Sequence, residues 1–310
     1  MSLPNQPNPT SEALKQALSE QSFETLEQLQ AFTKQFMAQR NNRSIGDFHG
    51  LSPAQMHQIL RQPFESPQLI ETPSVLEVEP EAEAVTLLKL LFDAIGDKGL
   101  KTTATGNLPR NFCREAALQY WGEAKYAERT RYGGINQELD FFDMHIVRVI
   151  AQDTGLIRKY KGSFVMTRDC RNLLQKSGMR AIYPRLFRHY IERFNWAYRR
   201  RLLGTDFVQH SCFFSLYLLT LYGHEQQSHT FYEDAFIQAF PMAVDAMPVV
   251  SYDTQEASLR RDYTYCVLVG LAGFWGLATV QTASDDFLAS DYNVKALPLL
   301  GEVLRFRISP

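Results

Sequence analysis

A chain of 310 residues is about twice the size of a common single domain, so two compact units and a helical extension are expected. Apolar residues make up 45% of the chain and charged residues 21%, a balance that excludes disordered, collagen-like and coiled-coil chains. The formal net charge of −2 excludes a uniformly basic protein that coats nucleic acid. Binding to a polyanion would therefore require a local cluster of cations.

The four cysteines are far apart in the chain and form no CxxC or other short pair: Cys113, Cys170, Cys212 and Cys266. This spacing indicates neither a disulfide framework nor a zinc knuckle, and it is typical of reduced thiols in the cytoplasm. The polar, proline-rich residues 1–10 are not followed by the apolar stretch of a secretory signal. We therefore expect a cytoplasmic protein.

One uncharged stretch, residues 263–284, approaches the length of a membrane-spanning helix. Gly270, Gly273 and Gly276 interrupt it, and its last residues are polar. These features favour a buried helix that turns into a strand, and we expect no membrane as a partner.

Residues 1–62 are predicted to form an N-terminal helical segment. Leucine and phenylalanine recur in it every three or four residues, which indicates one or two amphipathic helices. Farther along, Ser52 and Gln55 have the spacing of a capping box around Pro53, so a short helix is predicted to begin there and to end before the next proline.

Residues 63–84 are predicted to be an acidic, proline-rich linker. Prolines occur at 63, 67, 73 and 80, and the six glutamates between 62 and 88 are accompanied by no Lys or Arg. Repeated prolines prevent helix formation, and charges of one sign repel one another, so an extended segment is favoured.

Residues 85–178 show the element order of a winged-helix domain. An amphipathic helix precedes a short β-branched strand at 100–103, and two more helices follow, the second over 138–153. Lys161-Gly162 then separates two short strands, which indicates a β-hairpin, and Thr167 caps a final helix. Helix, strand, helix, helix and hairpin is the winged-helix order.

A second, elaborated copy of this pattern is predicted at the end of a helical region, residues 179–310. Gly155-Leu156, at the end of an apolar helix, recurs as Gly276-Leu277 in the same position. The second hairpin would be longer, with Asp285-Asp286 as turn residues. The expected fold class is therefore mainly α-helical with small β-hairpins: two winged-helix-like units plus N-terminal helices.

Two stretches resemble known protein families. Leu100 to Arg110 looks like the strand-turn-helix entrance of winged-helix units found in tandem in some helicase-associated and uncharacterised bacterial proteins. Gly50 to His57 is similar to a recurrent opening in bacterial proteins of unknown function. The resemblance covers about residues 45–178 and includes no catalytic motif and no phosphate-binding loop of a helicase. It supports the fold and leaves the function open.

The strongest chemical signal is an uneven distribution of charge. Residues 156–201 contain thirteen Lys or Arg against Asp169 and Glu192, whereas residues 202–259 contain seven acids and no Lys or Arg. The basic stretch can attract phosphate. The alternative is that the two stretches neutralise each other within one fold or across a dimer.

Ten residues are predicted to contact nucleic acid: Arg148, Gln152, Arg158, Lys159, Lys161, Arg185, Arg188, Arg199, Arg200 and Arg201. If duplex DNA binds in the usual way, the helix 138–153 enters the major groove and the hairpin touches the backbone. The hairpin fits this expectation, but the helix fits poorly, because its polar face, which holds His145 and Arg148, also carries two acidic residues.

Other motifs point to no catalytic, cofactor or metal site. His224 and His229 resemble a zinc-protease motif, but the spacing is one residue too long for both to face one ion on a regular helix. The glycine spacing at 270, 273 and 276 is not the dinucleotide-binding pattern. We therefore expect no cofactor, no metal and no enzymatic activity.

Two functions remain open from the sequence. The first is a nucleic-acid-binding or regulatory protein that contacts phosphates through the basic stretch. The second is a protein interaction or assembly module without nucleic-acid binding, in which the helix 260–274 and the N-terminal helices contact another subunit or a partner protein.

Overall fold

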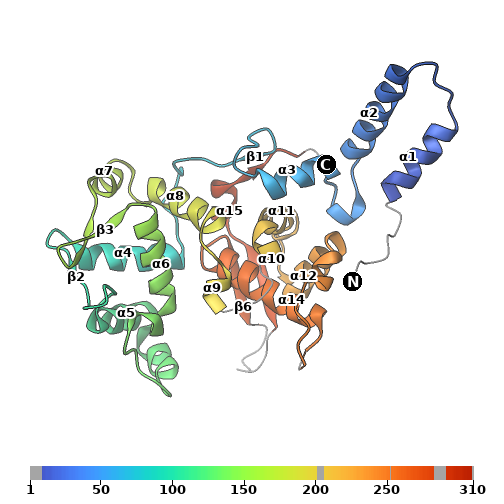
Figure 1. Cartoon of the computed structure of the whole chain (residues 1–310). Coiled ribbons are helices and arrows are strands. Elements are labelled where there is room, and N and C mark those ends of the chain that lie inside the picture. Colours follow the sequence, from blue (N-terminus) through green and yellow to red (C-terminus); the bar gives the residue numbers. More distant parts are fainter. Residues whose placement is uncertain (1–8, 201–205, 252, 283–290, 309–310) are drawn as a thin grey trace. The chain divides into compact units, whose positions relative to one another are not determined.

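The computed structural model describes residues 9–200, 206–251, 253–282 and 291–308 (Figure 1). In this part of the chain the structure is mainly helical with small antiparallel sheets, which confirms the predicted fold class at this level. The strand orders are β1-β8, β2-β4-β3 and β5-β7-β6. The chain separates into two compact units, one of residues 1–58 and 308–310 and one of residues 59–307.

The first unit contains two separate N-terminal helices, α1 (Pro9–Ser19) and α2 (Leu26–Asn42), followed by a 3₁₀ turn, η1 (Gly46–Phe48). The predicted capping box is present at the start of α3 (Pro53–Arg61), which continues into the second unit. The Ser52 N–H donates to Gln55 Oε1 at 2.8 Å, and the Gln55 N–H donates to Ser52 Oγ at 3.2 Å. The backbone N–H groups of Ser52 and Gln55 thereby gain hydrogen-bond acceptors at the start of the helix.

The predicted acidic linker lies along the second unit. Within it, β1 (Ile70–Glu71) pairs antiparallel with β8 (Arg305–Phe306), close to the other end of the chain. Ile70 and Leu76 are buried, and the Leu76 N–H donates to the Arg180 carbonyl at 3.0 Å. Apolar side chains spaced between the prolines and glutamates bind the segment to the protein surface.

The first half of the second unit has the predicted order of helices and strands. Its elements are α4 (Glu83–Ile95), β2 (Leu100–Lys101), α5 (Arg110–Arg129), η2 (Glu138–Asp140), α6 (Phe142–Asp153), β3 (Ile157–Tyr160), β4 (Ser163–Met166) and α7 (Arg168–Ser177). Lys161 and Gly162 connect β3 to β4 with φ values of 47° and 75°. Two successive positive φ angles are typical of a tight hairpin turn, so the predicted hairpin is confirmed.

The second half begins with α8 and ends with β8. Its elements are α8 (Met179–Glu192), α9 (Ala197–Arg200), α10 (Asp206–His210), α11 (Cys212–Tyr222), β5 (Gln227–Ser228), α12 (His229–Ala239), α13 (Met242–Asp245), α14 (Gln255–Tyr263), η3 (Thr264–Gly273), β6 (Ala278–Thr282), β7 (Tyr292–Ala296) and α15 (Pro298–Val303). The segment η3 is a π-helix, a wider coil than the α-helix, and it continues α14 without a break.

The two halves repeat the same backbone geometry around Gly155 and Gly276. Both glycines have a φ of 72°, which falls in the left-handed region. The Leu156 N–H donates to the Ala151 carbonyl at 2.9 Å, and the Leu277 N–H donates to the equivalent Ala272 carbonyl at 2.8 Å. The strand orders β2-β4-β3 and β5-β7-β6 correspond as well. The predicted turn residues Asp285-Asp286 lie outside the described residues.

Aromatic residues of α8 pack against the end of η3. The Tyr183 hydroxyl donates to the Trp275 carbonyl at 2.6 Å, and the Tyr190 hydroxyl donates to the Gly270 carbonyl at 3.2 Å. Within the apolar stretch considered above as a membrane segment, residues 263–282 thus form a buried helix that leads into the strand β6. Among the described helices, none has the length and the apolar character needed to cross a membrane.

Candidate functional site

The β3–β4 hairpin presents three of the predicted cations to solvent. Arg158, Lys159 and Lys161 are exposed, and Tyr160 between them is 49% exposed. The Arg158 guanidinium lies 5.1 Å from the centre of the Tyr160 ring, and the Lys161 ammonium lies 5.3 Å from it. Lys159 pairs with Phe164 across the ladder and lies over that ring. The hairpin therefore combines positive charge with an accessible aromatic ring.

The next helix, α7, adds three more exposed cations. The Thr167 hydroxyl caps it by accepting from the Cys170 N–H at 3.2 Å, and Arg168, Arg171 and Lys176 face solvent. We call the six side chains of these consecutive elements the hairpin–α7 surface: Arg158, Lys159, Lys161, Arg168, Arg171 and Lys176. None of the six forms an ion pair with a carboxylate among the described residues.

The prediction that His145 and Arg148 lie on an exposed polar face of α6 was wrong. Arg148 is only 7% exposed, and its Nε and Nη2 atoms lie 2.8 and 2.7 Å from Glu138 Oε1. His145 Nδ1 lies 2.6 Å from the same oxygen, and the Leu108 N–H donates to Glu138 Oε2 at 2.6 Å. The helix packs against α4, α8 and β3, and Glu138 supplies the hydrogen-bond acceptor for both His145 and Arg148.

Glu138 is the centre of this buried network, at 1% exposure. Burial by itself raises the pKa of this carboxyl group. The hydrogen bond from His145, the charge of Arg148 and the Leu108 N–H outweigh burial and hold the pKa of Glu138 below its usual value. The sequence carries no signal for this pairing, because Glu138 and Arg148 belong to different helices.

The remaining predicted contact residues are divided among several environments. Gln152 is half-buried, and its Oε1 atom is buried without a hydrogen-bond partner among the described residues. Arg185 is paired with Asp169 at 2.5 Å, and Arg188 is paired with Glu65 and Glu192 at 2.8 and 2.9 Å. Arg199 and Arg200 belong to α9, and Arg201 lies outside the described residues. The structure thus brings the predicted cations of the hairpin together, whereas carboxylates neutralise Arg185 and Arg188 of α8.

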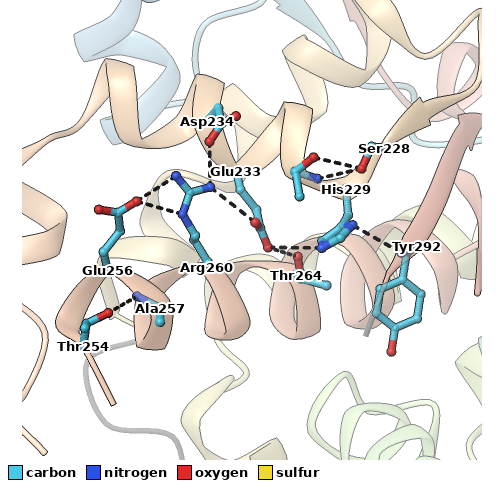
Figure 2. Close-up of polar contacts among 11 residues, drawn as sticks. Ser228, His229, Glu233, Asp234, Thr254, Glu256, Ala257, Arg260, Thr264 and Tyr292 are labelled. Carbon is cyan, nitrogen blue, oxygen red and sulfur yellow. Dashed lines mark hydrogen bonds and ion pairs between the residues drawn. The ribbon is translucent and has the colours of Figure 1, made fainter. Parts of the chain in front are cut away.

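A second polar cluster, which the sequence analysis did not identify, lies between α12 and the α14–η3 helix (Figure 2). Glu233 is 5% exposed and its Oε1 atom accepts from the Thr264 hydroxyl at 2.6 Å. Its Oε2 atom accepts from Arg260 Nη1 at 3.4 Å. Arg260 is also paired with Asp234 at 2.7 Å and with Glu256 at 2.8 Å. Figure 2 shows Arg260 surrounded by these three carboxylates.

This cluster lines a pocket of about 360 Å³. Its walls are His229, Glu233, Asp253, Ala257, Arg260, Arg261, Thr264, Tyr265 and Tyr292. The sequence carries a weak signal for it: His229 and Glu233 are four residues apart, as are Arg260 and Thr264, so each pair shares one face of its helix. Nothing in the sequence indicates that the two faces meet.

His224 and His229, which resemble a zinc-protease motif in the sequence, do not lie on one regular helix. His224 follows α11, His229 begins α12, and β5 lies between them. The two rings therefore do not share a helix. Among the described residues, no group of three or more His, Cys, Asp or Glu side chains is arranged to hold a metal ion.

All four cysteines are buried and none forms a disulfide with another: Cys113, Cys170, Cys212 and Cys266. Burial raises the pKa of Cys113 to about 12 and that of Cys170 to about 11. Burial raises the pKa of Cys212 to about 12 as well. These three thiols stay protonated at neutral pH, so they serve as small core side chains.

Part of the chain matches a known protein family. Residues 83–179 match the family model of the Y4jL N-terminal domain, a stretch that runs from the start of α4 through α7 and covers less than half of the chain. This stretch includes the hairpin–α7 surface, whereas the pocket at His229 and Glu233 lies outside it. No curated protein and no solved structure matches the chain.

Proposed function

We propose that α4 to α7 form a winged-helix unit that binds nucleic acid by contacting its phosphates, without catalysis. The observation that carries this proposal is the hairpin–α7 surface, where six exposed cations have no carboxylate partner among the described residues. Cations without a carboxylate partner are available to replace the counterions of a phosphate backbone. The hairpin β3–β4 takes the place of the wing.

The arrangement of α6 supports phosphate contacts rather than base readout. Sequence is read when side chains of a helix or strand reach base edges in a groove. Here α6 is covered by α4, α8 and β3, and its Arg148 is held by Glu138. We therefore propose binding that depends on charge and has little dependence on sequence.

Neutralising three cations of the hairpin–α7 surface tests this proposal. We expect the full-length protein to bind a random-sequence duplex with a Kd of about 10⁻⁴ to 10⁻⁶ M at physiological salt. For the triple variant Arg158→Gln/Lys161→Gln/Arg171→Gln, the slope of log K against log salt should become shallower by about 0.9 for each phosphate that the protein no longer neutralises. Fluorescence anisotropy across a salt series measures both quantities.

A matched control carries the same change of charge elsewhere in the second unit. Lys89, Lys125 and Lys295 are exposed on α4, α5 and β7. The variant Lys89→Gln/Lys125→Gln/Lys295→Gln should keep the affinity and the salt slope of the unchanged protein. An equal reduction of affinity in both variants would mean that net charge, and not this surface, governs binding, and the proposal would then fail.

Self-association through the N-terminal helices is a second candidate function. None of the side chains described in α2 is buried, and Leu26 at its start is 67% exposed. The rings of Phe23, Phe32 and Phe36 contact one another in series at 5.3 and 6.2 Å and are half-exposed. An apolar helix face of this kind favours pairing with a second copy. The apolar segment η3, also considered for subunit contacts, is buried inside the second unit.

The variant Phe32→Ser/Phe36→Ser tests the second candidate. We expect light scattering to show a dimer for the unchanged protein and a monomer for the variant, because the apolar contact between copies is removed. The control is Met242→Ser/Val249→Ser, which removes two exposed apolar side chains of the second unit. A concentration-independent monomer for the unchanged protein would exclude this function.

A further inference from the structure

We propose that the pocket between α12 and the α14–η3 helix binds a neutral, polyhydroxylated small molecule, such as a sugar or the ribose of a nucleoside. In this proposal a hydroxyl group of the ligand bridges His229 and Glu233. The pocket lies outside the hairpin–α7 surface, so the inference stands independently of nucleic-acid binding.

The first reason is a donor on His229 that has no protein acceptor within hydrogen-bond distance among the described residues. The Tyr292 N–H donates to His229 Nδ1 at 3.2 Å, which places the ring proton on Nε2. This Nε2 lies 4.0 Å from Glu233 Oε1, beyond hydrogen-bond distance, and has no hydrogen-bond partner among the described residues. The His229 side chain is only 10% exposed. This N–H belongs to a largely buried ring that lines the pocket, so it is available to an oxygen atom of a ligand.

The second reason is the position of the acceptor. Glu233 is held by the Thr264 hydroxyl on one oxygen and by Arg260 on the other (Figure 2). A carboxylate has about four acceptor positions, so capacity remains on Oε1. A hydroxyl oxygen at about 2.8 Å from both His229 Nε2 and Glu233 Oε1 fits their separation. It would accept from the imidazole and donate to the carboxylate, as a hydroxyl can and an unprotonated phosphate oxygen cannot.

The third reason is the balance of charge. Among the residues that line the pocket, the positive charges of Arg260 and Arg261 face the negative charges of Glu233 and Asp253. Arg260 is paired with Glu233, Asp234 and Glu256, and Arg261 is paired with Asp253. An anion would have to displace these carboxylates, and a cation would face the two guanidinium groups. A neutral ligand with several donors and acceptors avoids both costs.

The backbone supplies a further, independent observation. The helix changes from α to π at Thr264, and both Thr264 and Tyr265 line the pocket. Such π segments are rare and occur frequently at functional sites. The pocket volume of about 360 Å³ also lies within the range of about 300 to 1,000 Å³ that small-molecule sites occupy.

The test uses the full-length protein and four probes: D-glucose, D-ribose, adenosine and inorganic phosphate. Saturation-transfer NMR detects contact, and thermal shift detects stabilisation. We expect at least one of the three hydroxylated probes to bind and phosphate not to bind at this pocket. Binding of adenosine and ribose but not glucose would identify the ribose of a nucleoside as the ligand, and the reverse would identify a free sugar.

The variant His229→Asn separates the site from nonspecific binding. The asparagine carbonyl can still accept the Tyr292 N–H, but the side chain lacks a donor at the Nε2 position. We expect about a tenfold reduction of affinity for the bound probe, since one hydrogen bond in the pocket is removed. The control His224→Asn alters the nearby exposed histidine and should leave affinity unchanged.

Three results would overturn the proposal. One is the absence of binding by every hydroxylated probe. Another is phosphate binding that His229→Asn abolishes, because the pocket would then be an anion site. The last is a hydroxylated probe that binds the His229→Asn variant as tightly as it binds the unchanged protein, when circular dichroism and the melting temperature show that the variant is folded.

Discussion

Gly276→Ala is expected to lower the free energy of unfolding by about 3 kcal/mol, whereas Gly155→Ala should lower it by only about 1 kcal/mol. The two glycines have the same φ of +72° and end equivalent helices of the two halves. The cost of a side chain in the left-handed region is therefore common to both substitutions. Their surroundings differ, and that difference gives the larger effect at Gly276.

The difference comes from the segment that precedes α4. A Cβ atom at Gly276 would overlap the carbonyl oxygen of Glu81 and would lie 2.9 Å from Ala82 Cβ. At Gly155 the nearest atom is Arg185 Nη2 at 3.6 Å, at the end of a flexible side chain. Backbone atoms cannot move away as a side chain can, so the packing at Gly276 must be disrupted.

Urea denaturation of both variants measures these two reductions in stability. Equal reductions for Gly155→Ala and Gly276→Ala would show that only the φ angle matters and that residues 81–82 do not pack tightly against Gly276. A larger reduction in the free energy of unfolding for Gly155→Ala than for Gly276→Ala would contradict the close contact between Gly276 and residues 81–82.

Glu138→Gln is expected to lower the free energy of unfolding by about 3 to 5 kcal/mol at pH 7. The substitution removes the negative charge that compensates buried Arg148, and it replaces one carboxylate acceptor by an amide donor facing Arg148 or the Leu108 N–H. The control Glu128→Gln changes an exposed carboxylate of α5 and should alter stability by less than about 0.5 kcal/mol.

The effect of Glu138→Gln should also depend on pH. The pKa of Glu138 is lowered in the folded protein, so its ionisation stabilises the fold above the unfolded pKa of about 4.3. That contribution disappears as the pH falls through the lowered folded pKa, because the carboxylate becomes protonated in both states. The difference in stability between the unchanged protein and the variant should therefore shrink from pH 7 to pH 3.

Chemical denaturation at several pH values checks this expectation. A difference that stays constant between pH 7 and pH 3 would indicate that Glu138 contributes through its shape alone. A difference that grows at low pH would reverse the sign of the pKa shift and would exclude the buried ion pair described here.

Local interactions in this protein are encoded by neighbouring residues, and these could be predicted from the sequence alone. The capping box of Ser52 and Gln55 and the turn at Lys161-Gly162 depend on atoms only a few residues apart. The glycines at 155 and 276 mark the ends of two helices because few other residues adopt a positive φ there. Periodicity and turn chemistry therefore determined the order of helices and strands and the mainly helical class.

Only the tertiary structure decided which charged groups remain available to contact a ligand. Residues 156–201 are strongly basic as a sequence, yet Arg188 is paired with Glu65 from the segment before α4, and Arg148 is buried against Glu138. The pocket likewise requires α12 and α14–η3 to bring His229 and Glu233 beside Arg260 and Thr264. Such contacts join residues far apart in the chain, and they depend on how complete helix faces pack, which a local pattern of residue types does not specify.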